Sequence, residues 1–122
     1  MGSLVVFSKD VERCATFYEN VLGLLPRREG GDIRLFGDGE EVLVHSIPEA
    51  RANKIEIDDP PSPREYSALK PIFDVASLSR ALDQVKSSGG VVTSQTFTHE
   101  GLIRHDVLDP EGNIIQVRSR LR

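Results

Sequence analysis

The chain alternates between the apolar spacing of strands and that of helices. Residues 3–8 are apolar and rich in β-branched side chains, which predicts a first buried strand. Asp10 is then expected to cap a helix over residues 11–22 that ends at Gly23. The apolar stripe of this helix consists of Val11, Cys14, Ala15, Tyr18, Val21 and Leu22. Short strands are predicted at residues 25–28, 33–36 and 42–47, so the first half has the order β-α-β-β-β.

The second half repeats this order. A strand is predicted at residues 71–75, followed by a helix that begins after Ser77 and ends at Gly89-Gly90. Three strands follow, at residues 91–92 (with an extension to 97 left open), 102–108 and 114–117. Shifting the chain onto itself lays Asp10 on Ser77 and Gly23 on Gly90, which indicates an internal repeat.

The segment between the two halves has a different character. It holds four of the seven prolines (Pro48, Pro60, Pro61 and Pro63) and is predicted to be a linker, with an edge strand over residues 54–58 as an alternative. We therefore predict a single α+β domain of two βαβββ modules packed over one core. Module 1 covers about residues 1–47, the linker about 48–69 and module 2 about 70–119.

Composition narrows the possible partners and location. A net charge of −4 with interspersed acids and bases argues against a nucleic-acid surface. No apolar run is long enough to span a bilayer, and no charged and then apolar leader precedes the first strand. The single cysteine, Cys14, cannot form an internal disulfide, which is typical of the reducing cytoplasm. We expect a cytoplasmic protein that binds neither nucleic acid nor membrane.

Two motifs together resemble a known family. Asp109-Pro110-Glu111-Gly112-Asn113 is a tight turn between two strands, with a bulge expected at its glycine. It is similar to the "DPxGN" hairpin of the vicinal oxygen chelate superfamily, and Asp10-Val11, Phe17-Tyr18 and Val21-Leu22-Gly23-Leu24 resemble the opening of that family. The group includes glyoxalase I, extradiol dioxygenases, and fosfomycin- and bleomycin-resistance proteins. The resemblance implies paired modules whose sheets curl around a cleft, usually in a homodimer.

The resemblance also implies where a metal ion would be bound. The family's ligand positions fall on Ser3, Lys70 and Gln116, with a fourth on or beside His45 and Val44 as the alternative register. A hydroxyl is a poor ligand, a protonated amine has no lone pair, and a neutral amide brings no charge. Catalytic zinc normally takes three His, Cys or carboxylate ligands. We therefore expect no metal ion and no other cofactor.

Side chains alternate between the two faces of a strand, so the residues two positions away from these also face the cleft. This alternation predicts the lining of the cleft. One end is expected to be apolar (Val5, Phe7, Ile72 and Ile114) and the other charged or polar (Lys70, Asp74, Arg104, Asp106 and Gln116). The predicted ligand-binding residues are Phe7, His45, Lys70, Ile72, Arg104, Asp106, Ile114 and Gln116, with no catalytic residue assigned. Lys70 and Arg104 suit a carboxylate or phosphate. The alternative is that Lys70–Asp74 and Arg104–Asp106 are ion pairs on a solvated sheet.

Three functions agree with this pattern. The first is a metal-free protein that binds a small polar or anionic molecule. The second is a lyase or dioxygenase-type enzyme, either with an unorthodox metal site that uses His45 or with Lys70 or His45 as acid or base. The third is an assembly module in which the cleft has lost its role. We favour the first, because the chain does not supply the family's metal ligands.

Overall fold

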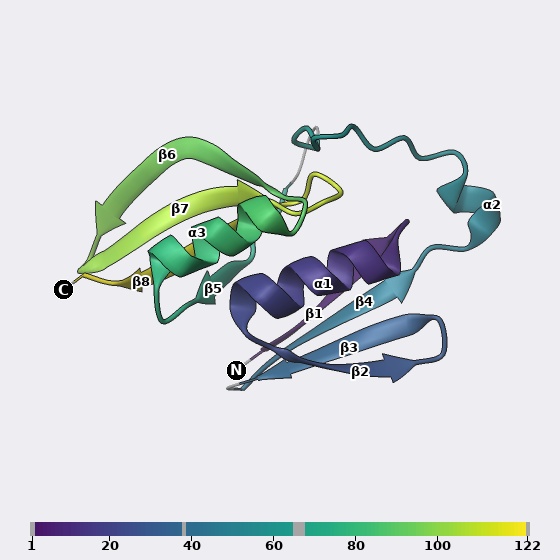
Figure 1. Ribbon diagram of the computed structural model, residues 1–122, viewed down its shortest axis with the longest axis horizontal. Helices are drawn as coiled ribbons and strands as arrows, with labels where there is room; N and C mark the ends of the chain where they lie inside the picture. Colours follow the sequence, from purple (N-terminus) through teal and green to yellow (C-terminus); the bar gives the residue numbers. More distant parts are fainter. Residues whose placement is uncertain (1, 38, 65–67, 122) are drawn as a thin grey trace.

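The described residues form two four-stranded sheets, each with a helix packed on one face (Figure 1). The computed structural model describes residues 2–37, 39–64 and 68–121. Module 1 consists of β1 (Gly2–Ser8), α1 (Val11–Leu22), β2 (Leu25–Glu29), β3 (Asp32–Gly37) and β4 (Glu40–Ser46). Its sheet, sheet 1, has the order β1-β4-β3-β2, and only the β1–β4 pair is parallel among the described residues.

Module 2 repeats this topology. It consists of β5 (Ile72–Asp74), α3 (Leu78–Ser87), β6 (Val91–His99), β7 (Leu102–Leu108) and β8 (Ile114–Arg120). Its sheet, sheet 2, has the order β5-β8-β7-β6, and its first strand is again parallel to its last. The matching order and pairing confirm the predicted α+β fold of two βαβββ modules.

The helix ends follow the predicted capping chemistry. The Asp10 side chain accepts a hydrogen bond from the Arg13 backbone N–H at 3.2 Å, and Ser77 does the same for Arg80 at 3.3 Å. Gly23 ends α1 with φ of 70°, in the left-handed region that glycine adopts without strain. The repeat of strand, cap and helix is therefore a structural repeat.

Two local predictions differ from the structure. The linker contains a short helix, α2 (Glu49–Ala52), and residues 54–58 form no strand. The bulge expected at Gly112 is present: Gly112 has φ of 86°, its N–H donates to the Asp109 carbonyl at 3.0 Å, and the Asp109 N–H donates to the Asn113 carbonyl at 2.9 Å, the pattern of a type I turn closed by a glycine bulge. A register shift also occurs in β6 between Val92 and Thr96. Strand β8 also continues to Arg120 because its last residues pair with β7. No helix among the described residues is long and apolar enough to cross a membrane.

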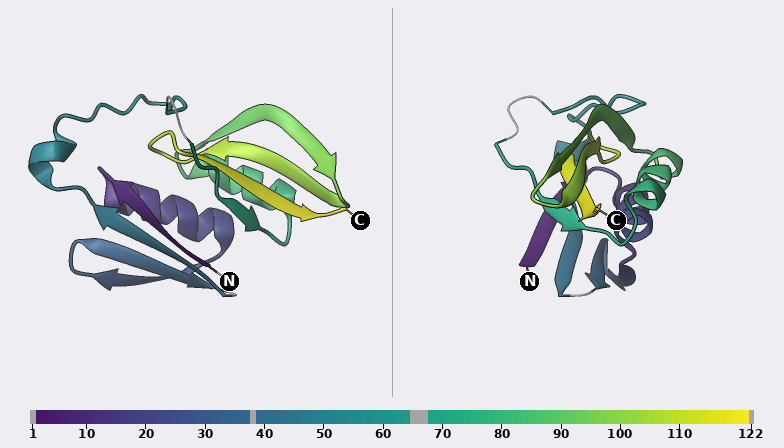
Figure 2. Two further views of the ribbon diagram at one scale, coloured as in Figure 1. Left: turned by 180° about the vertical axis from the view of Figure 1, so that it is seen from behind. Right: turned by 90° about the vertical axis from the view of Figure 1, so that its left-hand side faces the viewer.

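The two modules meet through their helices. Helices α1 and α3 lie side by side, and the right-hand view of Figure 2 shows both on the same side of the sheets. Buried side chains of both modules form one core, including Phe17, Leu35, Val85 and Ile115. No strand of sheet 1 pairs with sheet 2 among the described residues. The sheets therefore do not close around a cleft within the chain, which corrects that part of the expectation.

The hairpin at residues 109–113 joins module 2 to α1. The Asp109 carboxylate is fully buried and accepts hydrogen bonds from the Tyr18 hydroxyl at 2.7 Å, the Glu111 backbone N–H at 2.9 Å and the Asn113 side chain at 2.8 Å. The Asn113 backbone N–H donates a fourth, at 3.0 Å. Burial raises the pKa of Asp109, and these hydrogen bonds oppose the rise. The two motifs that resemble the family thus bond directly to each other.

A second buried carboxylate of this hairpin holds the start of α1. Glu111 is 5% exposed and accepts hydrogen bonds from the backbone N–H groups of Lys9 and Asp10, at 2.9 and 3.0 Å. It also accepts one from the Ser8 hydroxyl. Negative charge before the first turn of a helix also interacts favourably with its dipole. The hairpin therefore fixes both the position of module 2 and the β1–α1 turn.

We expect Tyr18→Phe to lower the free energy of unfolding by about 1.5–3 kcal/mol at pH 7, the usual range for a hydrogen bond to a charged group. Burial raises the pKa of Asp109 above its ordinary 3.8, so the folded protein holds this proton more tightly than the unfolded chain does. The contribution of Asp109 to stability therefore falls as pH rises from 3.8 through the raised pKa. The Tyr18 hydroxyl favours the ionised form, so the loss should shrink at acidic pH. Urea unfolding at pH 7 and pH 4 measures both effects.

The matched control is Thr16→Val, which removes an exposed hydroxyl from the same helix. It should change stability by less than about 0.5 kcal/mol. Equal stability of the wild type and Tyr18→Phe at pH 7 would contradict the role given to this hydrogen bond.

Candidate functional site

Each sheet has one face that no helix covers, and the predicted site residues lie on these open faces. On sheet 1 the open face carries Val5 and Phe7, which are 49% and 61% exposed, whereas Val6 between them is buried against the core. On sheet 2 it carries Ile72, Asp74, Arg104, Asp106, Gln116 and Arg118. Phe73, Val107, Ile115 and Val117 point to the opposite, helix-covered side and are buried. This is the alternation expected from the sequence.

Gln116 is the centre of a polar network on the open face of sheet 2. Its side chain is almost fully buried, donates to Asp106 Oδ1 at 3.1 Å and accepts from Arg104 Nη1 at 3.2 Å. The second oxygen of Asp106 accepts a hydrogen bond from Lys70 Nζ, also at 3.1 Å. Four of the predicted ligand-binding residues thus form one connected group, and the register places a fifth, Ile72, beside Gln116.

The ion pairs on this face differ from those expected. Lys70 pairs with Asp106 rather than Asp74, and Arg118 Nε binds Asp74 Oδ1 at 2.6 Å, which raises the pKa of Arg118. Arg104 forms no ion pair with any described carboxylate, although Asp106 lies on the same strand. Asp74 lies directly opposite Arg118 on the adjacent strand, closer than same-face residues along one strand, whereas Lys70 pairs with Asp106 of β7, two strands from β5. Lys70 and Arg118 are therefore neutralised, and Arg104 is not.

Arg104 also has an unsatisfied donor. Its Nε atom is buried and has no hydrogen-bond partner among the described residues. In the strand register Arg104 lies between Phe97 of β6 and Arg118 of β8. Like charges on adjacent strands repel, and an unpaired buried donor is costly. An oxyanion at this position would relieve both effects.

The open face of sheet 1 carries a histidine held by a carboxylate. His45 Nδ1 lies 2.7 Å from Asp32 Oδ2, and Asp32 Oδ1 accepts hydrogen bonds from the Ser46 backbone and hydroxyl at 2.9 and 3.2 Å. The Ser46 backbone bond and then His45 lower the pKa of Asp32. The rings of Phe7 and His45 meet edge to face at a centroid distance of 5.5 Å. This carboxylate fixes the imidazole orientation and leaves Nε2 without a described partner.

The residues at the implied metal positions do not fit a metal ion. The β1–β4 register places Glu41 opposite Ser3, whereas His45 lies opposite Phe7, and Val44 is buried against the core. Glu41 is bonded to Arg34, an interaction that sequence spacing did not reveal. On sheet 2, Lys70 and Gln116 are occupied by the network described above. No group of three or more His, Cys, Asp or Glu able to hold a metal ion occurs among the described residues.

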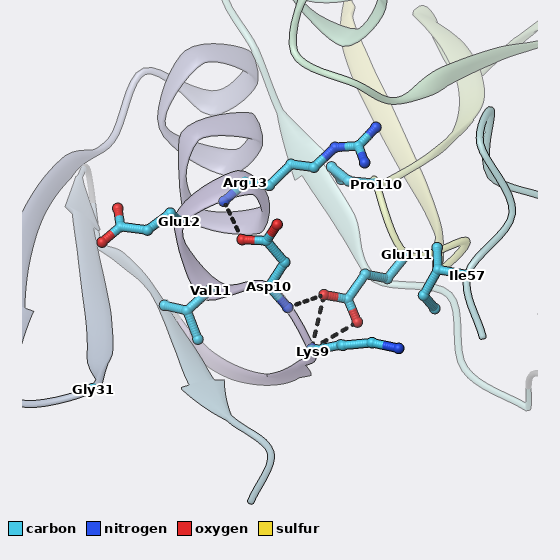
Figure 3. Close-up of a pocket in the computed structure, with 9 residues that line it drawn as sticks. All are labelled: Lys9, Asp10, Val11, Glu12, Arg13, Gly31, Ile57, Pro110 and Glu111. Carbon is cyan, nitrogen blue, oxygen red and sulfur yellow. Dashed lines mark hydrogen bonds between the residues drawn. The ribbon is translucent and has the colours of Figure 1, made fainter. Parts of the chain in front are cut away.

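Two cavities lie near the hairpin. The larger, of about 500 Å³, is lined by the start of α1 and by Ile57, Pro110 and Glu111 (Figure 3). Figure 3 shows the Asp10 carboxylate bonded to the Arg13 backbone and the Glu111 carboxylate bonded to Lys9 and Asp10. The carboxylates of this cavity therefore stabilise the fold, and no predicted site residue lines it.

The smaller cavity, of about 340 Å³, lies between the modules and is here called the inter-module pocket. It is lined by β1, the linker, Pro71 and the start of β8, with Val5, Phe7, Ile47, Ile55, Arg64 and Ile114 among its residues. It brings together Phe7 and Ile114, two of the predicted ligand-binding residues from different modules. Arg64 was not predicted, because a single arginine in a proline-rich linker carries no local signal of a site.

Comparisons with known proteins agree with this fold. Residues 1–117 match the model of the Glyoxalase/Bleomycin resistance protein/Dioxygenase superfamily. A search of curated proteins finds no match. A solved glyoxalase/bleomycin resistance protein from Albidiferax ferrireducens is similar over 99% of this chain and 98% of its own, with 16% identity and a TM-score of 0.72.

Two further solved structures have the same fold. Fosfomycin resistance protein FosX from Mesorhizobium loti has a TM-score of 0.70 and 11% identity, and the match covers 99% of this chain and 92% of that one. An integron cassette protein from Vibrio cholerae has a TM-score of 0.64 and 22% identity, with 98% and 93% covered. With a family model that matches nearly the whole chain and a fold shared with these structures, the protein belongs to the glyoxalase/bleomycin resistance protein/dioxygenase superfamily.

Proposed function

We propose that this protein binds a small anionic molecule on the open face of sheet 2, with Arg104 as the anion-binding group and without a metal ion. The observation that carries the proposal is the state of Arg104, which has no carboxylate partner and a buried, unpaired Nε among the described residues. The other cations of the network, Lys70 and Arg118, already have carboxylate partners.

The chemistry of guanidinium supports an oxyanion as the ligand. Arginine presents its donors in a planar fork that matches a carboxylate or phosphate, and such charge-assisted hydrogen bonds are stronger than neutral ones. A buried donor left unpaired costs about 1–3 kcal/mol, which an acceptor from the ligand would offset. Gln116 holds the guanidinium through Nη1 and orients it before the ligand arrives.

The surroundings indicate that the ligand also has an apolar part. Ile72 is 46% exposed and Phe97 is 41% exposed on the same face as Arg104. Sites for small molecules commonly combine apolar walls with a few polar groups that fix orientation. The superfamily contains a relative named for resistance to fosfomycin, a small molecule. An apolar acid recognised through one oxyanion fits these features.

We propose that the binding needs no cofactor because the residues present supply no metal-ligand set. In the family the ligands converge from both sheets, but Ser3 and Lys70 occupy two of those positions here. An ammonium would repel a divalent cation, and Lys70 is held by Asp106. The anion is therefore held by protein donors alone.

The charge of Arg104 should control affinity for anions. We expect Arg104→Gln to weaken the binding of benzoate and phenylphosphonate at least tenfold, measured by isothermal titration calorimetry. Arg80→Gln, an exposed arginine on α3, is the matched control and should change nothing. Treatment with a chelator should also leave affinity unchanged. Unaltered affinity in Arg104→Gln, or stoichiometric zinc, nickel, manganese or iron in protein purified without chelator, would overturn the proposal.

A second candidate function is acid–base catalysis without a metal, favoured by the His45–Asp32 pair. A carboxylate that fixes one imidazole nitrogen leaves the other able to accept a proton from a bound substrate. If the protein is such an enzyme, His45→Gln should abolish product formation from bound ligands, detected by mass spectrometry, while anion affinity persists. Ligands recovered unchanged from the wild type would exclude this candidate.

We further propose that the protein is a homodimer in which the open face of sheet 1 contacts the open face of sheet 2 of a second copy. Apolar residues are exposed on both faces, including Phe7 and Ile72. The described charges on the open face of sheet 1 are two arginines and three carboxylates (Arg27, Arg34, Glu29, Asp32 and Glu41). Those on sheet 2 are four cations and two carboxylates (Lys70, Arg104, Arg118, Arg120, Asp74 and Asp106). Opposite net charges favour pairing of the two faces.

We expect Phe7→Asp to raise the dimer dissociation constant at least tenfold, because burying a phenylalanine side chain contributes about 1.5–3 kcal/mol. Sedimentation velocity over a concentration series measures this constant. Leu121→Asp, which changes a half-exposed apolar residue beyond β8, is the control. A wild type that is monomeric at all concentrations would disprove the dimer.

A further inference from the structure

The inter-module pocket has a chemistry of its own, separate from the open face of sheet 2. Its walls come from β1 (Leu4 to Phe7), from Ile47 directly after β4, from Ile55 of the linker, and from Ile114 of β8. These side chains are aliphatic or aromatic, and the volume of about 340 Å³ lies within the range of small-molecule sites. Arg104 does not line this pocket.

Arg64 is the only charged residue among those that line the pocket in the described part of the chain. No carboxylate lines it, so the local charge favours an anion over a cation. The remaining polar side chains are already engaged. The Tyr18 hydroxyl and the Asn113 amide both donate to Asp109. A ligand would therefore find an apolar wall and one guanidinium.

Among the described residues, the Arg64 side chain forms only one long ion pair. Its Nη2 lies 3.8 Å from Glu111 Oε1, beyond hydrogen-bond distance, and the side chain donates no hydrogen bond to another described residue. Glu111 does not depend on Arg64, because Ser8, Lys9 and Asp10 already donate to its carboxylate. Reorienting the guanidinium towards a ligand would leave Glu111 satisfied.

The backbone of Arg64 is nevertheless fixed against the hairpin. Its N–H donates to the Gly112 carbonyl at 3.1 Å. Gly112 has φ of +86°, and a Cβ there would lie 2.2 Å from the Ser62 carbonyl oxygen, so only glycine allows the linker to pass this closely. The hairpin therefore places Arg64 at the pocket.

We infer that the inter-module pocket binds a small apolar monocarboxylate, with the carboxylate paired to Arg64 and the hydrocarbon packed between β1, Ile47, Ile55 and Ile114. This site is independent of the anion site proposed at Arg104. A neutral polar molecule would lose water without gaining partners here, whereas an apolar acid gains both hydrocarbon burial and a charge-assisted hydrogen bond.

The test uses octanoate as the probe and isothermal titration calorimetry of the full chain. Octanoate should bind, and Arg64→Gln should weaken it at least tenfold while leaving the binding of octanol unchanged. Arg51→Gln, an exposed arginine on α2 that does not line the pocket, is the matched control. Ile55→Trp should fill the pocket and abolish octanoate binding without lowering the melting temperature.

The Arg104→Gln variant distinguishes this inference from the proposed function. Arg104→Gln should leave octanoate affinity intact while it weakens benzoate and phenylphosphonate. Loss of octanoate binding in Arg104→Gln, or full affinity in Arg64→Gln, would place the carboxylate elsewhere and overturn the inference. The absence of octanoate binding to the wild type would overturn it too, whatever the result with phenylphosphonate.

Discussion

The buried carboxylates of Asp109 and Glu111 are the contacts on which the arrangement of the two modules depends. Placing a carboxylate in a protein core is unfavourable unless hydrogen bonds replace its water. Asp109 receives four such bonds and Glu111 is held by the β1–α1 turn, and the donors include Tyr18 and Ser8 of module 1. The hairpin can therefore satisfy its own charges only when module 2 lies against α1.

The position of the hairpin also determines where residues on the open face of sheet 2 lie, because the chain continues directly from one to the other. The hairpin leads directly into β8, so fixing Asn113 fixes the positions of Ile114 and Gln116. Gln116 then orients Arg104 through its amide oxygen. On the other side, Gly112 lets the linker pass close enough for Arg64 to be placed at the inter-module pocket. Both candidate anion-binding arginines thus depend on the same turn.

Cross-strand pairing decides which cations on sheet 2 are available. Arg118 lies opposite Asp74 of the adjacent strand β5, Lys70 before β5 pairs with Asp106 of β7, and Arg104 lies between Phe97 and Arg118. The net charge of this face does not identify which cation would bind an anion, because Lys70 and Arg118 are paired with carboxylates. The proposal depends instead on Arg104, whose Nε is buried and has no hydrogen-bond partner among the described residues. The residue at one of the family's metal-ligand positions also favours an anion, since Lys70 replaces a group that would bind a cation.

The sequence by itself determined the fold, because its signals are local. The capping residues Asp10 and Ser77, the stop at Gly23 and the alternation along each strand depend on neighbours within a few residues, and the structure confirms them. The same alternation predicted correctly which face carries Arg104 and Gln116.

Only the tertiary structure decided the partners across that face. It paired Lys70 with Asp106, left Arg104 without a carboxylate, placed Glu41 rather than His45 opposite Ser3, and brought Arg64 to the inter-module pocket. It also kept the two sheets apart within the described chain. These outcomes depend on strand register and on contacts between residues far apart in the chain, which no local pattern encodes.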